Sequence, residues 1–366
     1  MNNHVTVLKI DVKALEHNLN YIKSKLQPTT KVLAVVKAFG YGSDGVLIAD
    51  FLKDKVDYFA VAYAHEGIAL REAGIQNRIL VLHPQIENWK QIVEFCLEPS
   101  IYNFSTLKTF QGFCYGKDLR DYPIHLKFNT GLNRLGFLSK DTKSIIKELS
   151  SNNALKIQSA FSHLAASEDP KEKEYSLQQI ENFKSIIKEI ESKIDYQPFY
   201  HMSNTSGVLN YPEAHFDMIR TGIGLYGFAN NEKLTTQLKN THNLFSTISQ
   251  IHQINPGESV GYNRAFTAKK STKTATIPIG HADGISRHLG NNKGYVTIND
   301  YKAPIIGNVC MDMIMVDVTD IDCEEGDEVI IFDSQKTINA FAKLSNTISY
   351  EILTSISSRI KRLVIR

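Results

Sequence analysis

The sequence predicts an α/β protein, with an N-terminal (β/α)8 barrel of the TIM type followed by a mostly β C-terminal domain. Over the first two-thirds of the 366 residues, short apolar runs alternate with longer amphipathic stretches. This alternation is typical of a parallel sheet with helices outside it. About eight such units fit in this length, as in a closed barrel. Later in the chain, strand-like runs follow one another with only turns between them, which is typical of a β domain.

Nine apolar runs of the first part are candidate strands. They cover residues 5–10, 32–36, 58–62, 79–83, 101–104, 124–128, 157–162, 199–203 and 218–226. Helices are expected between them, for example at 14–26, 46–52 and 174–190, where apolar residues recur with a helical period in the last segment. An open doubly wound sheet is the alternative. It is less favoured because no Gly-x-Gly-x-x-Gly follows the early strands.

The second part changes its pattern after Asn230-Asn231-Glu232-Lys233. Strands are expected at 245–254, 272–279, 295–298, 304–306, 313–318 and 329–332, and helices at 339–344 and 350–358. Pro256-Gly257 and Gly326-Asp327 are typical turn dipeptides. We therefore expect domains at 1–233 and 234–366, and a solvated turn over 359–362.

Composition excludes several classes of protein. The chain has 41 Lys and Arg against 39 Asp and Glu, so its net charge of +2 offers no field for a polyanion. No apolar run is long enough to span a bilayer, and no signal-peptide pattern precedes the first strand. The four cysteines lack Cys-x-x-Cys spacing. We expect a cytoplasmic protein that binds no nucleic acid, membrane or metal.

Lys37 is the first candidate for chemistry. It follows the apolar run Val32-Leu-Ala-Val-Val, and active sites of barrels lie at the carboxyl ends of their strands. Apolar surroundings lower the pKa of an amine by desolvation and make it a usable nucleophile. A lysine that merely extends to solvent at a strand end is the alternative. Gly40 and Gly42 favour a site, because glycine lets a backbone approach a bulky ligand.

The segment Val36-Lys37-Ala38-Phe39-Gly40-Tyr41-Gly42 resembles the pyridoxal-phosphate lysine motif of the alanine racemases. Eight further segments resemble motifs of that family in the same order. They begin at Lys127, Phe161, His201, Arg220, Val260, Pro278 and Gly307, and Tyr350-Glu-Ile-Leu resembles the last motif of the family. Together these segments span residues 37 to 353, nearly the whole chain.

The resemblance implies two-base racemisation of L- and D-alanine with pyridoxal 5'-phosphate, supplying D-alanine for peptidoglycan. Lys37 would hold the cofactor covalently and act as one base. Tyr262 would be the other base, donated by the second subunit of a homodimer. Two bases are needed because the Cα proton leaves from one face and returns to the other. Without the family, Tyr262 beside Gly261 would be interpreted as an ordinary turn residue.

The resemblance also assigns the remaining site residues. Arg220 would contact the pyridine nitrogen, His163 would link it to Tyr262, and Arg134 would orient the substrate carboxylate or the phenolic oxygen of the cofactor. Lys127 would be carbamylated beside Arg134. The other cofactor-binding residues would be Tyr41, Asn204, Thr205, Gly222, Ile223 and Tyr350, and Met311 and Asp312 would contact substrate from the partner subunit.

Some positions depart from the family pattern. Asn129 stands where an aspartate is common, and His281 stands where a tyrosine is usual near the substrate entrance. Phe39 and Ser43 replace the more usual Asn and His of the lysine motif.

Three alternatives remain open from the sequence. A decarboxylase of the same fold would pair the pyridine nitrogen with a carboxylate, where this chain has Arg220. A non-catalytic cofactor-binding protein would not need the β domain with Tyr262. A racemase of serine, lysine or several amino acids would share all the motifs.

Overall fold

The computed structural model describes residues 5–229 and 232–366 of the chain. Eight consecutive strands form a closed parallel barrel in which β9 pairs with β2. These strands are β2 (Lys31–Val35), β3 (Tyr58–Val61), β4 (Arg78–Val81), β5 (Glu98–Ile101), β6 (Tyr122–Lys127), β7 (Leu155–Phe161), β8 (Phe199–His201) and β9 (Met218–Thr221). The predicted barrel is confirmed, and closure of the sheet excludes the doubly wound alternative.

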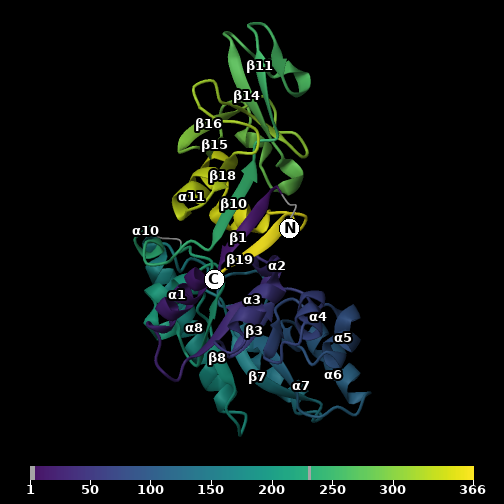
Figure 1. Cartoon of the computed structure of the whole chain (residues 1–366). Helices are drawn as coiled ribbons and strands as arrows, with labels where there is room; N and C mark the ends of the chain where they lie inside the picture. Colours follow the sequence, from purple (N-terminus) through teal and green to yellow (C-terminus); the bar gives the residue numbers. More distant parts are fainter. Residues whose placement is uncertain (1–4, 230–231) are drawn as a thin grey trace.

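Helices surround the barrel, as the lower half of Figure 1 shows. They are α1 (Val12–Lys23), α3 (Gly45–Leu52), α4 (Ala64–Glu72), α5 (Trp89–Glu94), α6 (Phe104–Tyr115), α7 (Thr142–Leu149), α8 (Lys173–Glu191) and α9 (Thr205–Asn210). In α8, Ile180, Phe183, Ile186 and Ile190 are buried at helical spacing. Burial of each such side chain contributes roughly 1.5–3 kcal/mol, so this face of α8 fixes the helix to the barrel.

The second part is a nine-stranded sheet with the order β11-β14-β17-β16-β15-β18-β10-β1-β19. Its strands are β1 (Val7–Asp11), β10 (His242–Thr247), β11 (Gln250–Ile254), β14 (Thr272–Ile277), β15 (Tyr295–Ile298), β16 (Tyr301–Ile306), β17 (Ile314–Asp317), β18 (Glu328–Phe332) and β19 (Lys361–Ile365). The two-stranded sheet β12 (Ser259–Val260) and β13 (Phe266–Thr267) and the helices α10 (Glu232–Thr235), α11 (Gln335–Leu344) and α12 (Ser349–Thr354) complete this part. The mostly β character of the second part is confirmed.

The first strand lies in this large sheet and not in the barrel. β1 pairs antiparallel with β10 and parallel with β19, and Figure 1 shows it beside β10 between the barrel and the upper sheet. Leu8 and Ile10 are buried there at alternate positions, which is the period of a strand with one covered face. The expected boundary between residues 233 and 234 adjoins residues outside the described ranges and stays a prediction.

Three local expectations were wrong. The run 245–254 forms two strands, because Ile248 and Ser249 donate hydrogen bonds to different neighbours, Asp327 and Thr276. The run 218–226 ends as a strand at Thr221, since Gly222 begins a turn that accepts from the amide of Leu225. The expected solvated turn near the C-terminus leads into β19, which pairs with β1 through its backbone.

No helix in the described part of the chain is long and apolar enough to cross a membrane.

Candidate active site

A cavity of about 680 Å³ lies at the carboxyl ends of the barrel strands. It is lined by eleven of the predicted site residues, namely Lys37, Tyr41, Lys127, Arg134, His163, Asn204, Thr205, Arg220, Gly222, Ile223 and Tyr350. All but Tyr350 come from the barrel half of the chain, and Tyr350 is carried by α12. Residues from six separate motifs therefore meet at one place.

Lys37 follows β2 directly and begins α2 (Lys37–Tyr41), a short turn with left-handed backbone. Ala38, Phe39 and Tyr41 have φ values of 53°, 54° and 53°. Each such non-glycine residue costs about 1–2 kcal/mol, so other contacts must hold the turn. Glu66 accepts a hydrogen bond from the amide of Ala38 at 2.7 Å.

Burial lowers the pKa of Lys37, and the nearby Arg134 guanidinium lowers it further. A larger share of the amine is therefore neutral at a given pH than in a solvated lysine, which is the state in which an amine acts as a nucleophile or base.

Arg220 is buried on β9, and its guanidinium group donates four hydrogen bonds. Its Nη1 donates to His201 Nδ1 at 2.6 Å, and its Nη2 donates to His163 Nδ1 at 3.0 Å. Nη2 also donates to the backbone carbonyls of Ser162 and Met202. Burial lowers the pKa of Arg220 to about 9, so the guanidinium stays charged at pH 7 and can only donate.

His163 is neutral in this arrangement. Burial and the charge of Arg220 hold its pKa well below the ordinary value. Because Nδ1 accepts from Arg220, the proton of the neutral ring lies on Nε2.

The cavity is strongly cationic. Lys37, Lys127, Arg134 and Arg220 line it, and no Asp or Glu is among its lining residues. Burial, followed by the charge of Arg134, lowers the pKa of Lys127 to about 8. The Lys127 ammonium lies 5.7 Å from the centre of the Phe161 ring. Buried cations need anionic partners, so the cavity is suited to a ligand with several negative charges.

On the side of the cavity near Tyr41, two side chains lie very close to the backbone of glycine residues. A Cβ at Gly222 would lie 2.2 Å from the Tyr41 hydroxyl, and a Cβ at Gly224 would lie 2.5 Å from the Thr205 methyl group. Only glycine at these positions lets both hydroxyls approach the backbone. Burial raises the pKa of Tyr41, so its hydroxyl remains a hydrogen-bond donor. Thr205, which is expected to bind the cofactor, is buried.

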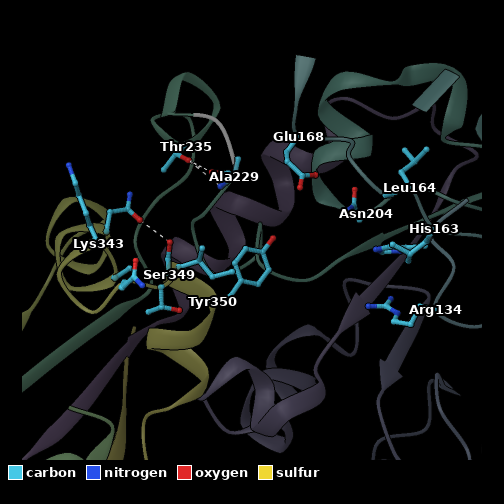
Figure 2. Close-up of a pocket in the computed structure, with 17 residues that line it drawn as sticks. Arg134, His163, Leu164, Glu168, Asn204, Ala229, Thr235, Lys343, Ser349 and Tyr350 are labelled. Carbon is cyan, nitrogen blue, oxygen red and sulfur yellow. Dashed lines mark hydrogen bonds between the residues drawn. The ribbon is translucent and has the colours of Figure 1, made fainter. Parts of the chain in front are cut away.

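A second cavity of about 960 Å³ adjoins the first and shares Arg134, His163, Asn204 and Tyr350 with it. Figure 2 shows Tyr350 projecting from α12 into the space between that helix and the side that carries Arg134 and His163. This cavity lies between the barrel rim and the helices α11 and α12 of the second part.

Three predicted site residues lie elsewhere. Tyr262, Met311 and Asp312 belong to loops of the second part, and none of them lines either cavity. The Tyr262 and Met311 side chains are 74% and 58% exposed. Asp312 forms an ion pair with Arg359 at 2.6 Å.

Asn129 does not take part in the charge balance around Lys127. Its side-chain oxygen accepts hydrogen bonds from the amides of Gly131 and Asn133 at 3.1 and 3.0 Å. An aspartate would accept the same bonds, so this departure from the family pattern concerns the loop 129–133.

Sequence reasoning missed the polar residues beneath Arg220. His201 contacts Arg220 directly, and His125 and Glu98 form a buried pair in the barrel. The available signal was a charged or imidazole side chain inside an apolar strand, as in Leu97-Glu98-Pro-Ser-Ile and Ile124-His125-Leu.

Comparisons with known proteins agree over the whole chain. The family model "Alanine racemase, N-terminal domain" matches residues 10–230, and "Alanine racemase, C-terminal domain" matches residues 241–364. Alanine racemase of Rickettsia akari is 36% identical over 366 residues, covering 98% of this chain and 98% of the relative.

Two solved structures are similar throughout. Alanine racemase of Clostridium difficile 630 in complex with cycloserine has a TM-score of 0.91 and 31% identity, covering 100% of this chain and 96% of the other. Alanine racemase from Bartonella henselae with covalently bound pyridoxal phosphate has a TM-score of 0.88 and 31% identity, with 99% of each chain covered.

Proposed function

The chain belongs to the alanine racemase family, and from this premise we propose which of its residues carry out the reaction. The enzyme is a pyridoxal-phosphate-dependent isomerase that interconverts L-alanine and D-alanine. The observation that carries the assignment is the cationic cavity around Lys37, which has Arg220 at its base and no lining carboxylate. We propose that the product supplies peptidoglycan precursors in the cytoplasm; the four free thiols support that compartment.

The residues of the cavity fit the cofactor. The hydroxyls of Tyr41 and Thr205, brought close to the backbone by Gly222 and Gly224, suit a phosphate group, together with Tyr350 and the backbone at Ile223. Lys37 would hold the cofactor covalently, with Asn204 and His163 at its edges. When bound, pyridoxal phosphate supplies a conjugated ring that withdraws electrons from Cα of the amino acid.

Arg220 favours racemisation over competing reactions of the same cofactor. A carboxylate beside a ring nitrogen can keep that nitrogen protonated, which strengthens electron withdrawal and favours decarboxylation and transamination. Arg220 can only donate a hydrogen bond, so it would leave the ring nitrogen of a bound cofactor without a proton. This argues against the decarboxylase alternative.

We propose that Lys37 and Tyr262 of the partner subunit are the two bases. Lys37 Nζ takes or returns the Cα proton on one face, and the Tyr262 hydroxyl serves the other face. The exposure of Tyr262, and its absence from the cavities of its own chain, support a homodimer in which each subunit completes the site of its partner. His163 and Arg220 would help to stabilise the tyrosine when it has lost its proton.

The substrate carboxylate would be held by Arg134, whose fork can donate two hydrogen bonds to it. Met311 and Asp312 of the partner subunit would close the other side of the substrate. Arg359 donates to both Asp312 and Asp283 at 2.6 Å, which holds the Asp312 loop in place. We further propose that Lys127 is carbamylated, which would give Arg134 an anionic neighbour.

Replacing Tyr262 by Phe tests the two-base assignment. Racemisation should fall in both directions, because each direction needs one group to take the proton and another to return it. Loss of a positioned acid–base group costs about 10²–10⁴ in rate. Exchange of the Cα proton with deuterated solvent should persist for only one enantiomer, through Lys37.

The matched control is Tyr301→Phe, because Tyr301 is also an exposed tyrosine of the second part, at 64%. It should leave racemisation unchanged, and cofactor absorbance should be retained in both variants. If Tyr262→Phe exchanges both enantiomers at the wild-type rate, Tyr262 is not the second base.

A further inference from the structure

A chain of buried hydrogen bonds leads from Arg220 into the interior of the barrel. Arg220 Nη1 donates to His201 Nδ1 at 2.6 Å, and His201 Nε2 lies 3.0 Å from Ser159 Oγ. Ser159 Oγ lies 2.6 Å from His125 Nδ1, and His125 Nε2 lies 2.7 Å from Glu98 Oε2. Four neighbouring strands, β5 to β8, thus contribute one polar side chain each, and Arg220 on β9 is the fifth.

The side chains that form these hydrogen bonds are buried. Ser159, His125 and His201 are fully buried, and Glu98 is 4% exposed. Phe161 stacks on the His201 ring with centroids 4.8 Å apart and planes inclined by only 5°. The stacking fixes the plane of the imidazole, so its two nitrogens keep their separate partners.

This series of hydrogen bonds ends at an ion pair near the opposite end of the barrel. Arg78, at the beginning of β4, donates from Nε to Oε1 of Glu98. Burial opposes ionisation of Glu98, but the hydrogen bonds donated by His125 and Arg78 and the charge of the Arg78 guanidinium outweigh it and hold the pKa of the carboxyl below its ordinary value. Glu98 is therefore an anion, although it is buried.

The two ends of the chain impose the same direction on every hydrogen bond. A carboxylate only accepts, so His125 must carry a proton on Nε2 toward Glu98. The Ser159 hydroxyl then donates its own proton to Nδ1 of His125. Ser159 in turn accepts from His201 Nε2–H, which leaves the Nδ1 lone pair of His201 facing Arg220. The dipoles align from guanidinium to carboxylate, and aligned hydrogen bonds strengthen one another.

Arg220 has no carboxylate of its own. Within the described residues it forms no ion pair, and its partners are two imidazoles and two carbonyl groups. Glu98 is the anion at the other end of its hydrogen-bond chain.

We propose that Glu98 is a positioning residue for Arg220. Its carboxylate sets the proton positions of His125 and His201, and thereby holds the Arg220 guanidinium as a fixed donor toward the cavity. The inference rests on the proposed role of Arg220 beside the ring nitrogen of the cofactor. Glu98, His125 and Ser159 lie inside the barrel and do not line the cavity.

Glu98→Gln tests the direction of the chain. Since Arg78 donates to Oε1, the amide oxygen of the glutamine should take that position and its NH₂ should face His125. The proton of His125 should then move from Nε2 to Nδ1, which opposes the hydroxyl of Ser159. Nitrogen-15 NMR of histidine-labelled protein reads this proton position directly, without reference to activity. The rate constant kcat should fall about five- to tenfold, the effect of weakening one hydrogen bond, with KM for alanine unchanged.

Asp217→Asn is the matched control. Asp217 is a carboxylate near the same end of the barrel and accepts from the amide of Tyr200 at 2.8 Å, but it lies outside the hydrogen-bond chain. Its replacement should leave the proton positions of both histidines and the kinetic constants unchanged.

Ser159→Ala distinguishes an effect of Glu98 that is transmitted through the hydrogen bonds from an effect on the stability of the protein. If Glu98→Gln does not fold, Ser159→Ala tests the proposal alone. It should shift the His201 signals, leave the proton of His125 on Nε2 and lower kcat by a similar factor. The double variant should lose no more than the larger single loss, because both changes interrupt one path. Losses that multiply, or unchanged histidine signals in Glu98→Gln, would overturn the proposal. A wild-type protein without racemase activity would contradict the proposed function, and the NMR result would still decide this inference.

Discussion

At the scale of single residues, the site is defined by positive charge that the chain itself does not neutralise. Lys37, Lys127, Arg134 and Arg220 line one cavity without a carboxylate. Burial, followed by their mutual repulsion, lowers the pKa of both lysines, so a larger share of each amine is neutral and reactive at a given pH. The negative charge that such a cavity requires is supplied by the phosphate and carboxylate of its ligands and, in our proposal, by a carbamate on Lys127.

Carbamylation of Lys127 is testable by its pH dependence. Carbon dioxide adds to the neutral amine, and the pKa of about 8 means that this form predominates above pH 8 and declines below it. Carbon-13 NMR of protein in labelled bicarbonate should show a carbamate signal that weakens as the pH falls through 8. The signal should vanish in Lys127→Met and persist in Asn129→Asp, because residue 129 bonds to its own loop. A signal that survives Lys127→Met would assign the carbamate to another amine.

At the scale of elements, the left-handed turn after β2 depends on its neighbours in the second part of the chain. Arg362 of β19 donates from Nε and Nη2 to the carbonyl of Gly42 at 3.0 and 2.8 Å. Ser43 is bonded to His242 of β10 at 2.7 Å, and both are fully buried. The turn that presents Lys37 is therefore held by two strands of the large sheet.

Gly42→Ala should destabilise this junction. Gly42 has a φ of +84°, and an added Cβ would lie 2.0 Å from the carbonyl oxygen of Leu353 in α12. Backbone strain of about 1–2 kcal/mol and overpacking of about 1–3 kcal/mol should both lower the free energy of unfolding in urea.

Gly74→Ala is the control for backbone strain alone, since Gly74 has a φ of +85° and nothing within 4 Å of an added Cβ. Gly74→Ala should lower the free energy of unfolding only by the backbone strain. Equal losses in the two variants would show that α12 moves away freely.

Strong periodic patterns made most elements predictable. The strand at residues 295–298 and the buried face of α8 were expected from apolar spacing alone. The sequence did not predict that β1 joins the large sheet, because an apolar run does not reveal which sheet a strand belongs to. The partners of β1 are more than 200 residues away in the chain.

For the site, the family motifs predicted the residues that line the cavity but not those that support it. Glu98 and Ser159 belong to none of the resembling segments, and they were found only from their contacts with His125. A polar residue in a buried strand gives a signal in the sequence, but its partner depends on the register of the barrel.

At the scale of the whole molecule, the proposed division of labour between subunits predicts complementation. Lys37→Ala and Tyr262→Phe should each be nearly inactive. A mixed dimer contains one site with both native residues, so random exchange of chains should restore about a quarter of the wild-type activity. Activity after mixing and chain exchange is the measurement.

The control mixes Lys37→Ala with a chain that carries both changes. No dimer of that mixture has Lys37, so activity should stay absent. If exchange of chains is demonstrated by mass and no activity returns in the first mixture, the shared site is disproved.

The position of β1 also has a mechanical consequence. The chain enters the barrel from β1 directly into α1, whose first turn is capped by Asp11, and the chain resumes the sheet at β10, the hydrogen-bonded neighbour of β1. The barrel is thus connected to the large sheet at two neighbouring strands, β1 and β10. A single connection would allow the barrel to rotate about that connection. A rotation of the barrel relative to the large sheet would have to disrupt the hydrogen bonds between β1 and β10, and these bonds therefore oppose such a rotation.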